Sequence, residues 1–322
     1  MRVRIETAAR LHMGFLDMHG GLGRRFGSVG VGLEEPRLVL EAVPAPELTC
    51  EGPGAEAALE FAERYCQAFS SCGGRIPVKA HIRIIEMIPR HVGLGSGTQL
   101  ALAVGTALAR LGGVEARVGN LALAMGRGRR SRMGIGSFEA GGFMVDGGRR
   151  VDEEALPPML LRRALPRDWF FVVVVPEVEP GLCGEREDQA FDDLAPPSAE
   201  RAGRIARLLV MSMLPALVEN DIENFGAALT EIQRLVGDSF SPVQGGRYAN
   251  RMSGRLIDDL LALGAVGAGQ SSWGPTVYGL VRGENAARTL KQALEAGPDG
   301  EQLTIRISGA SERGARVTEL LR

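Results

Sequence analysis

Lysine is almost absent from this chain of 322 residues: Lys79 and Lys291 are its only lysines, and arginine carries nearly all of the positive charge. Because arginine is abundant along the whole chain, we attribute most of it to a bias in nucleotide composition. The formal net charge is -2. A chain without a strong basic field is not drawn to nucleic acid or to an anionic membrane, so we expect small molecules as its ligands.

Long apolar runs are also missing. No stretch reaches the roughly 18 uninterrupted apolar residues that a membrane-spanning helix needs. Arginine and glutamate interrupt residues 1–15, so this segment does not have the pattern of a secretory signal. We therefore expect a cytoplasmic protein.

Paired cysteines and closely spaced histidines are absent too. The cysteines include no CxxC pair, and we expect them to be reduced: Cys50, Cys66, Cys72 and Cys183. The histidines show no HExxH spacing: His12, His19, His81 and His91. Neither pattern favours a transition-metal site made by protein ligands alone.

The hydrophobic pattern predicts a mixture of strands and helices, with a strand over Phe170–Val175 that is buried on both faces. Alternation predicts the other strands at residues 2–11, 37–43, 76–88, 142–146, 265–281 (two strands around a glycine turn) and 302–308. Helical spacing predicts helices at residues 55–69, 99–111, 117–128, 198–219, 221–238, 248–264 and 286–296, with Ser198 and Asp221 as N-caps. These patterns favour an α+β fold with two domains, 1–165 and 166–322.

The stretch "HVGLGSGTQLALAVGTALARLGG" begins as a glycine loop and continues as a helix. Glycines at 93, 95 and 97 let the backbone approach a ligand closely, and the helix directs unpaired N–H groups and its positive dipole end toward the loop. Ser96 and Thr98 add hydroxyl groups for phosphate or Mg²⁺. This combination predicts a site for phosphate or diphosphate at Gly93, Gly95, Ser96, Gly97 and Thr98.

The spacing of this loop is neither Walker A, which requires a lysine after the last glycine, nor GxGxxG. The segment "PRHVGLGSGTQLALAVGTAL" resembles the phosphate loop of the GHMP kinase superfamily, and "GAVGAGQSSWGPTVYGLV" resembles its third, glycine-rich motif. The resemblance implies a GHMP kinase-like fold of two α+β halves with the active site in the cleft between them.

Four blocks narrow the resemblance within that superfamily: "ARLHMGFLDMHGGLGRRFGSVGVGLEEP", "GRGRRSRMGIGSFEAGGFMVDGG", "FSPVQGGRYA" and "GQSSWGPTVYGL". Together they are similar to β-ribofuranosylaminobenzene 5′-phosphate synthases of methanopterin biosynthesis. The implied reaction joins 5-phosphoribosyl 1-pyrophosphate to 4-aminobenzoate and releases pyrophosphate and carbon dioxide. The residues do not distinguish 4-aminobenzoate from 4-hydroxybenzoate.

Two parts expected of a kinase are missing. Where aspartate-using kinases of the superfamily have Ser-Gly-x-Asp, this chain has Glu139 two residues after Ser137. The lysine of their first motif is replaced by a segment with Arg10 and His12. An ATP-dependent small-molecule kinase is therefore the second hypothesis, and a binding or regulatory protein on a kinase-like fold is the third.

Ribosyl transfer requires groups that neutralise pyrophosphate and a carboxylate near the sugar. We expect Arg24 and Arg25 to bind the 5′-phosphate, because their planar guanidinium groups accept two oxygens at once. Arg127, Arg129 and Arg130 form a second arginine run. Asp17 and Glu139 are the candidate carboxylates and, with His12, the candidate catalytic residues. Ser96 and Glu139 are the candidate ligands of Mg²⁺.

The aromatic substrate requires a second set of residues. Arg10 and His12 are two positions apart, so in a strand they face the same side, where they could bind a carboxylate. Trp273 is a candidate stacking surface for the benzene ring. The remaining candidates for orienting the substrate are Gln244, Ser271 and Ser272. From the enzyme class we expect a homodimer.

Overall fold

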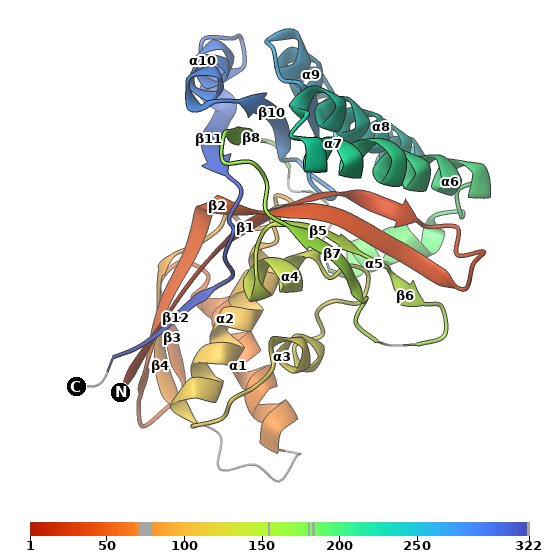
Figure 1. Ribbon diagram of the computed structural model, residues 1–322. Coiled ribbons are helices and arrows are strands. Elements are labelled where there is room, and N and C mark those ends of the chain that lie inside the picture. Colours follow the sequence, from red (N-terminus) through yellow and green to blue (C-terminus); the bar gives the residue numbers. More distant parts are fainter. Residues whose placement is uncertain (71–78, 154, 180, 182–183, 321–322) are drawn as a thin grey trace.

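The computed structural model describes residues 1–70, 79–153, 155–179, 181 and 184–320, and Figure 1 shows them as two α+β units. Cys72 and Cys183, for which we expected reduced thiols, lie outside these residues. None of the helices in the described ranges is both long and apolar enough to cross a membrane.

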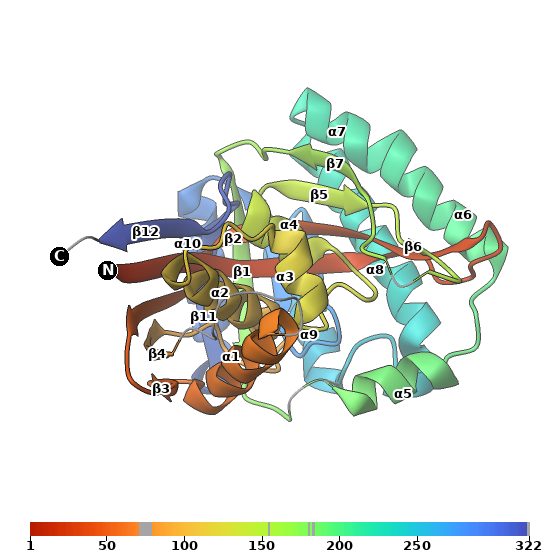
Figure 2. The same cartoon turned by 90° about the horizontal axis from the view of Figure 1, so that it is seen from below.

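The first unit is built on a sheet with the strand order β12-β1-β2-β4-β3, in which β5 and β6 also pair with β2, and β7 pairs with β5. Its strands are β1 (Arg2–Asp17), β2 (Arg24–Pro44), β3 (Thr49–Glu51), β4 (Ala80–Glu86), β5 (Phe143–Asp146), β6 (Arg149–Arg150), β7 (Met159–Arg163) and β12 (Arg316–Leu320). The helices α1 (Ala55–Ser70), α2 (Ser96–Leu111), α3 (Val118–Ala124) and α4 (Met133–Glu139) lie together on one side of this sheet (Figure 2).

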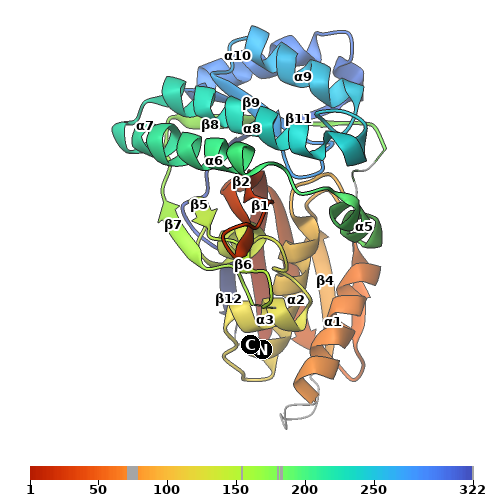
Figure 3. The same ribbon diagram turned by 90° about the vertical axis from the view of Figure 1, so that its right-hand side faces the viewer.

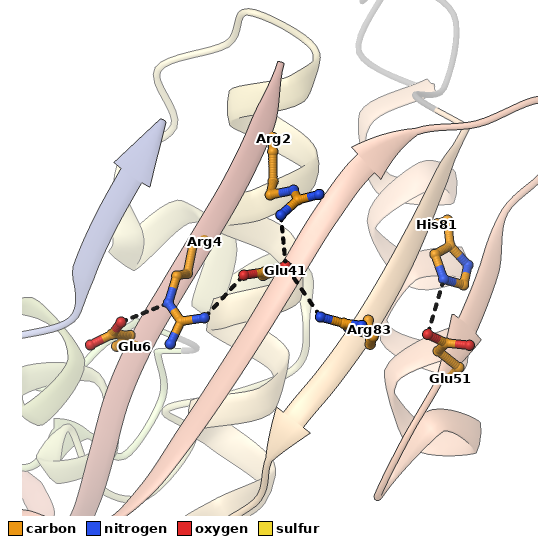
Figure 4. Close-up of polar contacts among 7 residues, drawn as sticks. All are labelled: Arg2, Arg4, Glu6, Glu41, Glu51, His81 and Arg83. Carbon is orange, nitrogen blue, oxygen red and sulfur yellow. Dashed lines mark hydrogen bonds and ion pairs between the residues drawn. The ribbon is translucent and has the colours of Figure 1, made fainter. Parts of the chain in front are cut away.

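The alternation that predicted β1 and β2 divides their side chains between the two faces of the sheet. Val3 and Ile5 are fully buried. On the outer face, Glu41 accepts ion pairs from Arg2, Arg4 and Arg83 at 3.5, 3.0 and 3.6 Å (Figure 4). Exposed pairs of this kind contribute little to stability, and they show how a chain rich in arginine neutralises its surface.

The second unit contains an antiparallel sheet of order β11-β8-β10-β9, which Figure 3 shows above the first unit. Its strands are β8 (Trp169–Pro176), β9 (Gly267–Gln270), β10 (Val277–Arg282) and β11 (Leu303–Gly309). Its helical segments are α5 (Glu185–Asp193), α6 (Ala199–Leu208), the π-helical turn η1 (Leu209–Met213), α7 (Leu214–Glu219), α8 (Ile222–Gln244), α9 (Arg251–Ala262), α10 (Glu284–Glu295) and the 3-10 turn η2 (Gly300–Gln302).

Several predicted features of the second unit are confirmed. The predicted central strand is β8, in which Phe171 to Val174 are at most 1% exposed. Ser198 accepts a hydrogen bond from the N–H of Arg201 at 3.2 Å, and Asp221 from that of Asn224 at 3.0 Å, so both predicted N-caps are present. The helix predicted over 198–219 is present as α6, η1 and α7 in succession.

The elements that were not expected from the sequence are α4, α5, η2, β3, β6, β7 and β12. The last of these pairs with the first strand, with Arg2 opposite Leu320, so the chain ends beside its beginning (Figure 1). A strand from the predicted segment 166–322 therefore completes the sheet of the predicted segment 1–165. The units also share a core, in which Phe143 of β5 packs edge-on against Phe225 of α8 at 5.6 Å.

Candidate active site

The glycine loop leads into the N-terminus of α2, as predicted. Gly93 and Gly95 have φ values of 87° and 81°, which favour glycine. A Cβ atom on Gly93 would collide with the carbonyl oxygen of Ser271, so the loop packs directly against the third glycine motif. The carbonyl of Gly95 accepts hydrogen bonds from the N–H groups of Thr98 and Gln99 at 3.1 and 3.2 Å, which starts the helix.

A cavity of about 400 Å³ opens in front of this helix terminus, and residues of both units line it. The first unit contributes the loop and side chains from β1, α1 and the segment after β4. The second contributes residues around α5 and the third glycine motif. The lining residues with polar or aromatic side chains are Arg10, Glu60, Phe61, Arg64, Arg90, His91, Ser96, Thr98, Arg127, Glu187, Ser272 and Trp273. A cleft between the two units is therefore present beside the glycine loop, as the resemblance to GHMP kinases implied.

Four arginines are among the described residues that line this cavity, and two of them lie close to the glycine loop. Arg10 donates from Nη1 to the carbonyl of Gly93 at 2.5 Å, while its buried Nε has no hydrogen-bond partner in the described part of the chain. Burial lowers the pKa of Arg10 to about 10, an effect that the carboxylate of Glu187 partly offsets. A desolvated cation with an unused donor is stabilised when an anion enters.

Arg127 is the second of these cations. Its guanidinium lies 4.8 Å from the centre of the Phe61 ring, and a Cβ on Gly97 would lie 3.6 Å from its Nη2 atom. Burial, followed by the nearby charge of Arg64, lowers the pKa of Arg127. The cation therefore faces the first turn of α2, where the helix dipole also favours negative charge.

Among the described residues that line the cavity, Glu60 and Glu187 carry carboxylates. Oε1 of Glu187 accepts a hydrogen bond from the indole Nε1 of Trp273 at 3.2 Å and lies 3.4 Å from Nη1 of Arg130. Trp273 is 6% exposed, and its ring packs against Phe240 at 4.5 Å. Trp273 thus lines the cavity as predicted, while its role in stacking on a substrate stays a prediction.

Arg10 and His12 do not share one pocket. His12 lines a smaller cavity of about 30 Å³ with Gln244, and Ser272 lines both cavities. The β1–β2 register shifts between Ala8 and Arg10 and again after His12, so simple alternation along β1 does not hold at these residues. Within the described residues the buried Nε2 of His12 has no partner, and burial lowers its pKa to about 3, with the charge of Arg10 contributing.

Two further substrate candidates make internal hydrogen bonds. Ser271 is fully buried, accepts a hydrogen bond from the N–H of His12 at 3.0 Å and donates one to the carbonyl of Gly93 at 2.7 Å. It therefore joins β1 to the glycine loop. Gln244 donates to the carbonyl of Arg247 at 2.8 Å at the edge of the small cavity.

Four other predicted site residues do not line the large cavity. Glu139 pairs with Arg132 at 3.1 Å, at the end of α4. Asp17 accepts hydrogen bonds from two N–H groups in the β1–β2 turn, at 2.8 and 3.0 Å. Arg24 donates to the carbonyls of Gly147 and Gly148, and Arg25 lies 5.4 Å from the centre of the Phe26 ring.

The structure also reveals cavity residues that the sequence analysis missed. Glu60 and Arg64 are four residues apart on α1, which is an ordinary pattern for a solvated helix face. Their position follows only from the packing of α1 against α2. Arg90 immediately precedes the loop, and that adjacency was the available signal. Glu187 belongs to α5, which we did not predict.

Comparisons with known proteins agree with this arrangement. The model of the GHMP kinase N-terminal domain matches residues 56–137, and that of the GHMP kinase C-terminal domain matches residues 213–299. The chain is 33% identical to the beta-ribofuranosylphenol 5'-phosphate synthase of Methanothermobacter thermautotrophicus, over 97% of each chain. It is 36% identical to the protein of the same name from Archaeoglobus fulgidus, over 98% of this chain and 99% of the other.

Solved structures with this fold include kinases at low sequence identity. Homoserine kinase from Cytophaga hutchinsonii has a TM-score of 0.66 and 18% identity, covering 98% of this chain and 97% of its own. Phosphomevalonate kinase from Streptococcus pneumoniae has a TM-score of 0.70 and 11% identity, covering 97% and 100%. These likenesses show the fold alone. The identity over full length shows more: the chain belongs to the family of beta-ribofuranosylphenol 5'-phosphate synthases, enzymes built on the GHMP kinase fold.

Proposed function

We propose that this enzyme joins the ribose 5-phosphate unit of 5-phosphoribosyl 1-pyrophosphate to the ring of a para-substituted benzoate, with loss of pyrophosphate and carbon dioxide. The observation that carries the proposal is the set of four arginines beside the N-terminus of α2, in a cavity that both units line. A diphosphate leaving group needs such a concentration of cations and N–H donors. Membership of the family supports the same reaction.

The acceptor carries an electron-donating group opposite its carboxylate. The sequence resemblance implies 4-aminobenzoate, whereas the names of the relatives specify a phenol product, which corresponds to 4-hydroxybenzoate. Both compounds direct electron density to the ring carbon that bears the carboxylate. We propose that acceptors of this class are used, and the assay below compares the two.

The reaction balances without an external oxidant or base. The ring carbon that bears the carboxylate forms a bond to C1 of the ribose as the bond from C1 to pyrophosphate breaks. Carbon dioxide then leaves, and the electron pair of its carbon-carbon bond restores the aromatic ring. The protein must bind pyrophosphate, stabilise the charge that develops as pyrophosphate leaves, and hold the two reacting carbons close to each other.

We propose Mg²⁺ as the cofactor. Mg²⁺ in phosphate sites is held mostly by phosphate oxygens and water, with one or two protein ligands. The cavity offers the hydroxyl of Ser96 and the carboxylates of Glu60 and Glu187 for this purpose, whereas Glu139 lies outside it. When bound, Mg²⁺ would neutralise the charge that develops on pyrophosphate. Chelation with EDTA should abolish turnover, and added Mg²⁺ should restore it.

The test is to incubate the enzyme with the sugar donor and carboxyl-labelled 4-hydroxybenzoate or 4-aminobenzoate, and to follow labelled carbon dioxide and pyrophosphate together. Equal release of both products, dependent on both substrates, supports the proposal, and the ratio of kcat/KM identifies the preferred acceptor. Hydrolysis of ATP with an added alcohol, and no carbon dioxide, would instead establish a kinase.

A homodimer and a cytoplasmic location belong to the same proposal. Apolar side chains are exposed on β7 and along η1 and α7, namely Leu160, Val210, Met211 and Val218, with exposed fractions of 64%, 56%, 70% and 56%. Burial of such residues against a second copy would be favourable. Sedimentation analysis tests the dimer, and fractionation of the source cells tests the location.

A further inference from the structure

A further cavity of about 150 Å³, the arginine cavity, is lined by residues from α3, the segment that follows α3, and β6. Its lining includes Arg127, Arg129 and Arg149, with Gly126 and Gly128 between them. The volume is about five times the roughly 30 Å³ that one water molecule occupies in the liquid. The space can therefore hold a small polyatomic anion.

Positive charge dominates this cavity. Three of its described lining residues are arginines, and no carboxylate is among the described ones. Within that same set, the buried Nε atoms of Arg127 and Arg149 have no hydrogen-bond partner. The arginines of the outer sheet face are different, because Arg2, Arg4 and Arg83 all pair with Glu41. Among the described residues the buried Nε atoms of Arg25 and Arg132 also have no partner, so it is the concentration of such donors around one cavity that indicates an anion site.

Two of these guanidinium groups lie near aromatic rings. The guanidinium of Arg149 lies 5.8 Å from the centre of the Phe26 ring, and that ring also contacts Arg25. The guanidinium of Arg127 lies 4.8 Å from the centre of the Phe61 ring. A guanidinium stacked on a ring keeps its N–H donors in its own plane, at its edges. These donors are pre-oriented, so binding an anion requires little further loss of side-chain freedom.

Arg127 lines both the arginine cavity and the active-site cavity. On the basis of the proposed function, we propose that the arginine cavity is a separate anion subsite for the 5-phosphate of the sugar donor, while the active-site cavity binds the pyrophosphate. This assignment differs from our expectation for Arg24 and Arg25, which are not among the described lining residues of the arginine cavity; Arg24 donates to the carbonyls of Gly147 and Gly148. It gives the donor two anchors, one on each side of its reacting carbon.

The test uses ligands that carry one anion each, and it needs no turnover. Ribose 5-phosphate is titrated calorimetrically into the enzyme, with and without saturating pyrophosphate. Two subsites predict that ribose 5-phosphate still binds when pyrophosphate is present. Arg129→Gln and Arg149→Gln should weaken ribose 5-phosphate at least about tenfold and leave pyrophosphate affinity within about twofold.

Arg150→Gln is the matched control. Arg150 neighbours Arg149 on β6, but it is exposed and pairs with Glu153 at 3.0 Å, so its replacement should change neither affinity. Thermal unfolding of each variant verifies its fold, and the exposed Arg129 provides a test even if the Arg149 variant is unstable.

Mutual exclusion of the two ligands, or equal weakening of both by the variants, would overturn the second subsite. Unchanged affinity for ribose 5-phosphate in both variants would also overturn it. Failure of the proposed reaction is a different result, because it would appear as the absence of carbon dioxide release even where both ligands bind as described.

Discussion

At the scale of single residues, Gly95 has the most direct link between conformation and binding. It precedes α2 with a φ of 81°, and a Cβ there would lie 3.3 Å from the guanidinium carbon of Arg10. We predict that Gly95→Ala lowers kcat/KM by one to two orders of magnitude, since the left-handed conformation costs alanine roughly 1–2 kcal/mol and the methyl group displaces Arg10. Steady-state kinetics with varied sugar donor measure the effect.

Gly113→Ala is the control for that variant. Gly113 follows the other end of α2 with a φ of 68°, and a Cβ there would meet no atom within 4 Å. The two substitutions impose similar backbone strain, but only one affects the cavity. An equal loss of kcat/KM in both variants would attribute the effect to helix stability rather than to binding.

His12 provides a prediction on pH. Its pKa is lowered to about 3 by burial, from 6.5 for a free side chain. Between these values the unfolded chain binds a proton that the folded chain does not, so the free energy of unfolding falls as the pH falls. The loss from this residue is about 2 kcal/mol near pH 5 relative to neutral pH.

Urea unfolding of the wild type and of His12→Asn, near pH 7 and near pH 5, measures this contribution. The wild type should lose about 2 kcal/mol more than the variant between the two conditions. The same pH dependence in both proteins would mean that His12 is not held in its neutral form by the fold. The catalytic role that we assigned to His12 stays a prediction.

At the scale of elements, local patterns predicted most helices and strands but not α4. Its sequence, MGIGSFE, has glycines at 134 and 136, which disfavour a helix. The helix forms because α2 packs against it: the side-chain amide of Gln99 donates to the carbonyl of Gly134 at 2.8 Å, and a Cβ on Gly134 would lie only 3.0 Å from Thr98. This tertiary contact is not visible in local sequence.

The candidate site was also predictable only where its residues form a local sequence pattern. Loop residues such as Gly93 and Ser96 form a contiguous motif whose chemistry depends on local backbone, so sequence found them. Glu60 and Arg64 have no local signature, and only the packing of α1 against α2 makes them cavity residues. Glu139 lies close to a motif in the sequence, but the fold does not place it among the described lining residues of the cavity.

The N-cap of α8 gives a prediction about stability alone. Asp221 accepts the hydrogen bond from the N–H of Asn224, and it is not among the lining residues of the active-site cavity. Asp221→Ala should lower the free energy of unfolding, because a helix N–H loses its partner. Activity of the folded enzyme should not change. Denaturant unfolding together with kcat/KM measures both quantities, and a fall in kcat/KM without unfolding would contradict the prediction.

At the scale of the whole molecule, the active-site cavity depends on both units being present. The arginines among its described lining residues belong to the first unit, whereas Glu187, Ser272 and Trp273 belong to the second. The shared core and the return of β12 to the first sheet hold the two sides of the cleft together. The chain therefore has the fold of the GHMP kinases, and its arginine-rich cavity suits a sugar diphosphate donor.

The central claim is that the enzyme forms a bond between C1 of the ribose and a ring carbon. The most direct measurement is carbon-13 NMR of the product made from donor labelled at C1 and acceptor labelled in the ring. We predict a one-bond coupling between C1 and a ring carbon, together with loss of the carboxylate. A product joined through nitrogen or oxygen, or a phosphorylated substrate with its carboxylate intact, would contradict the account.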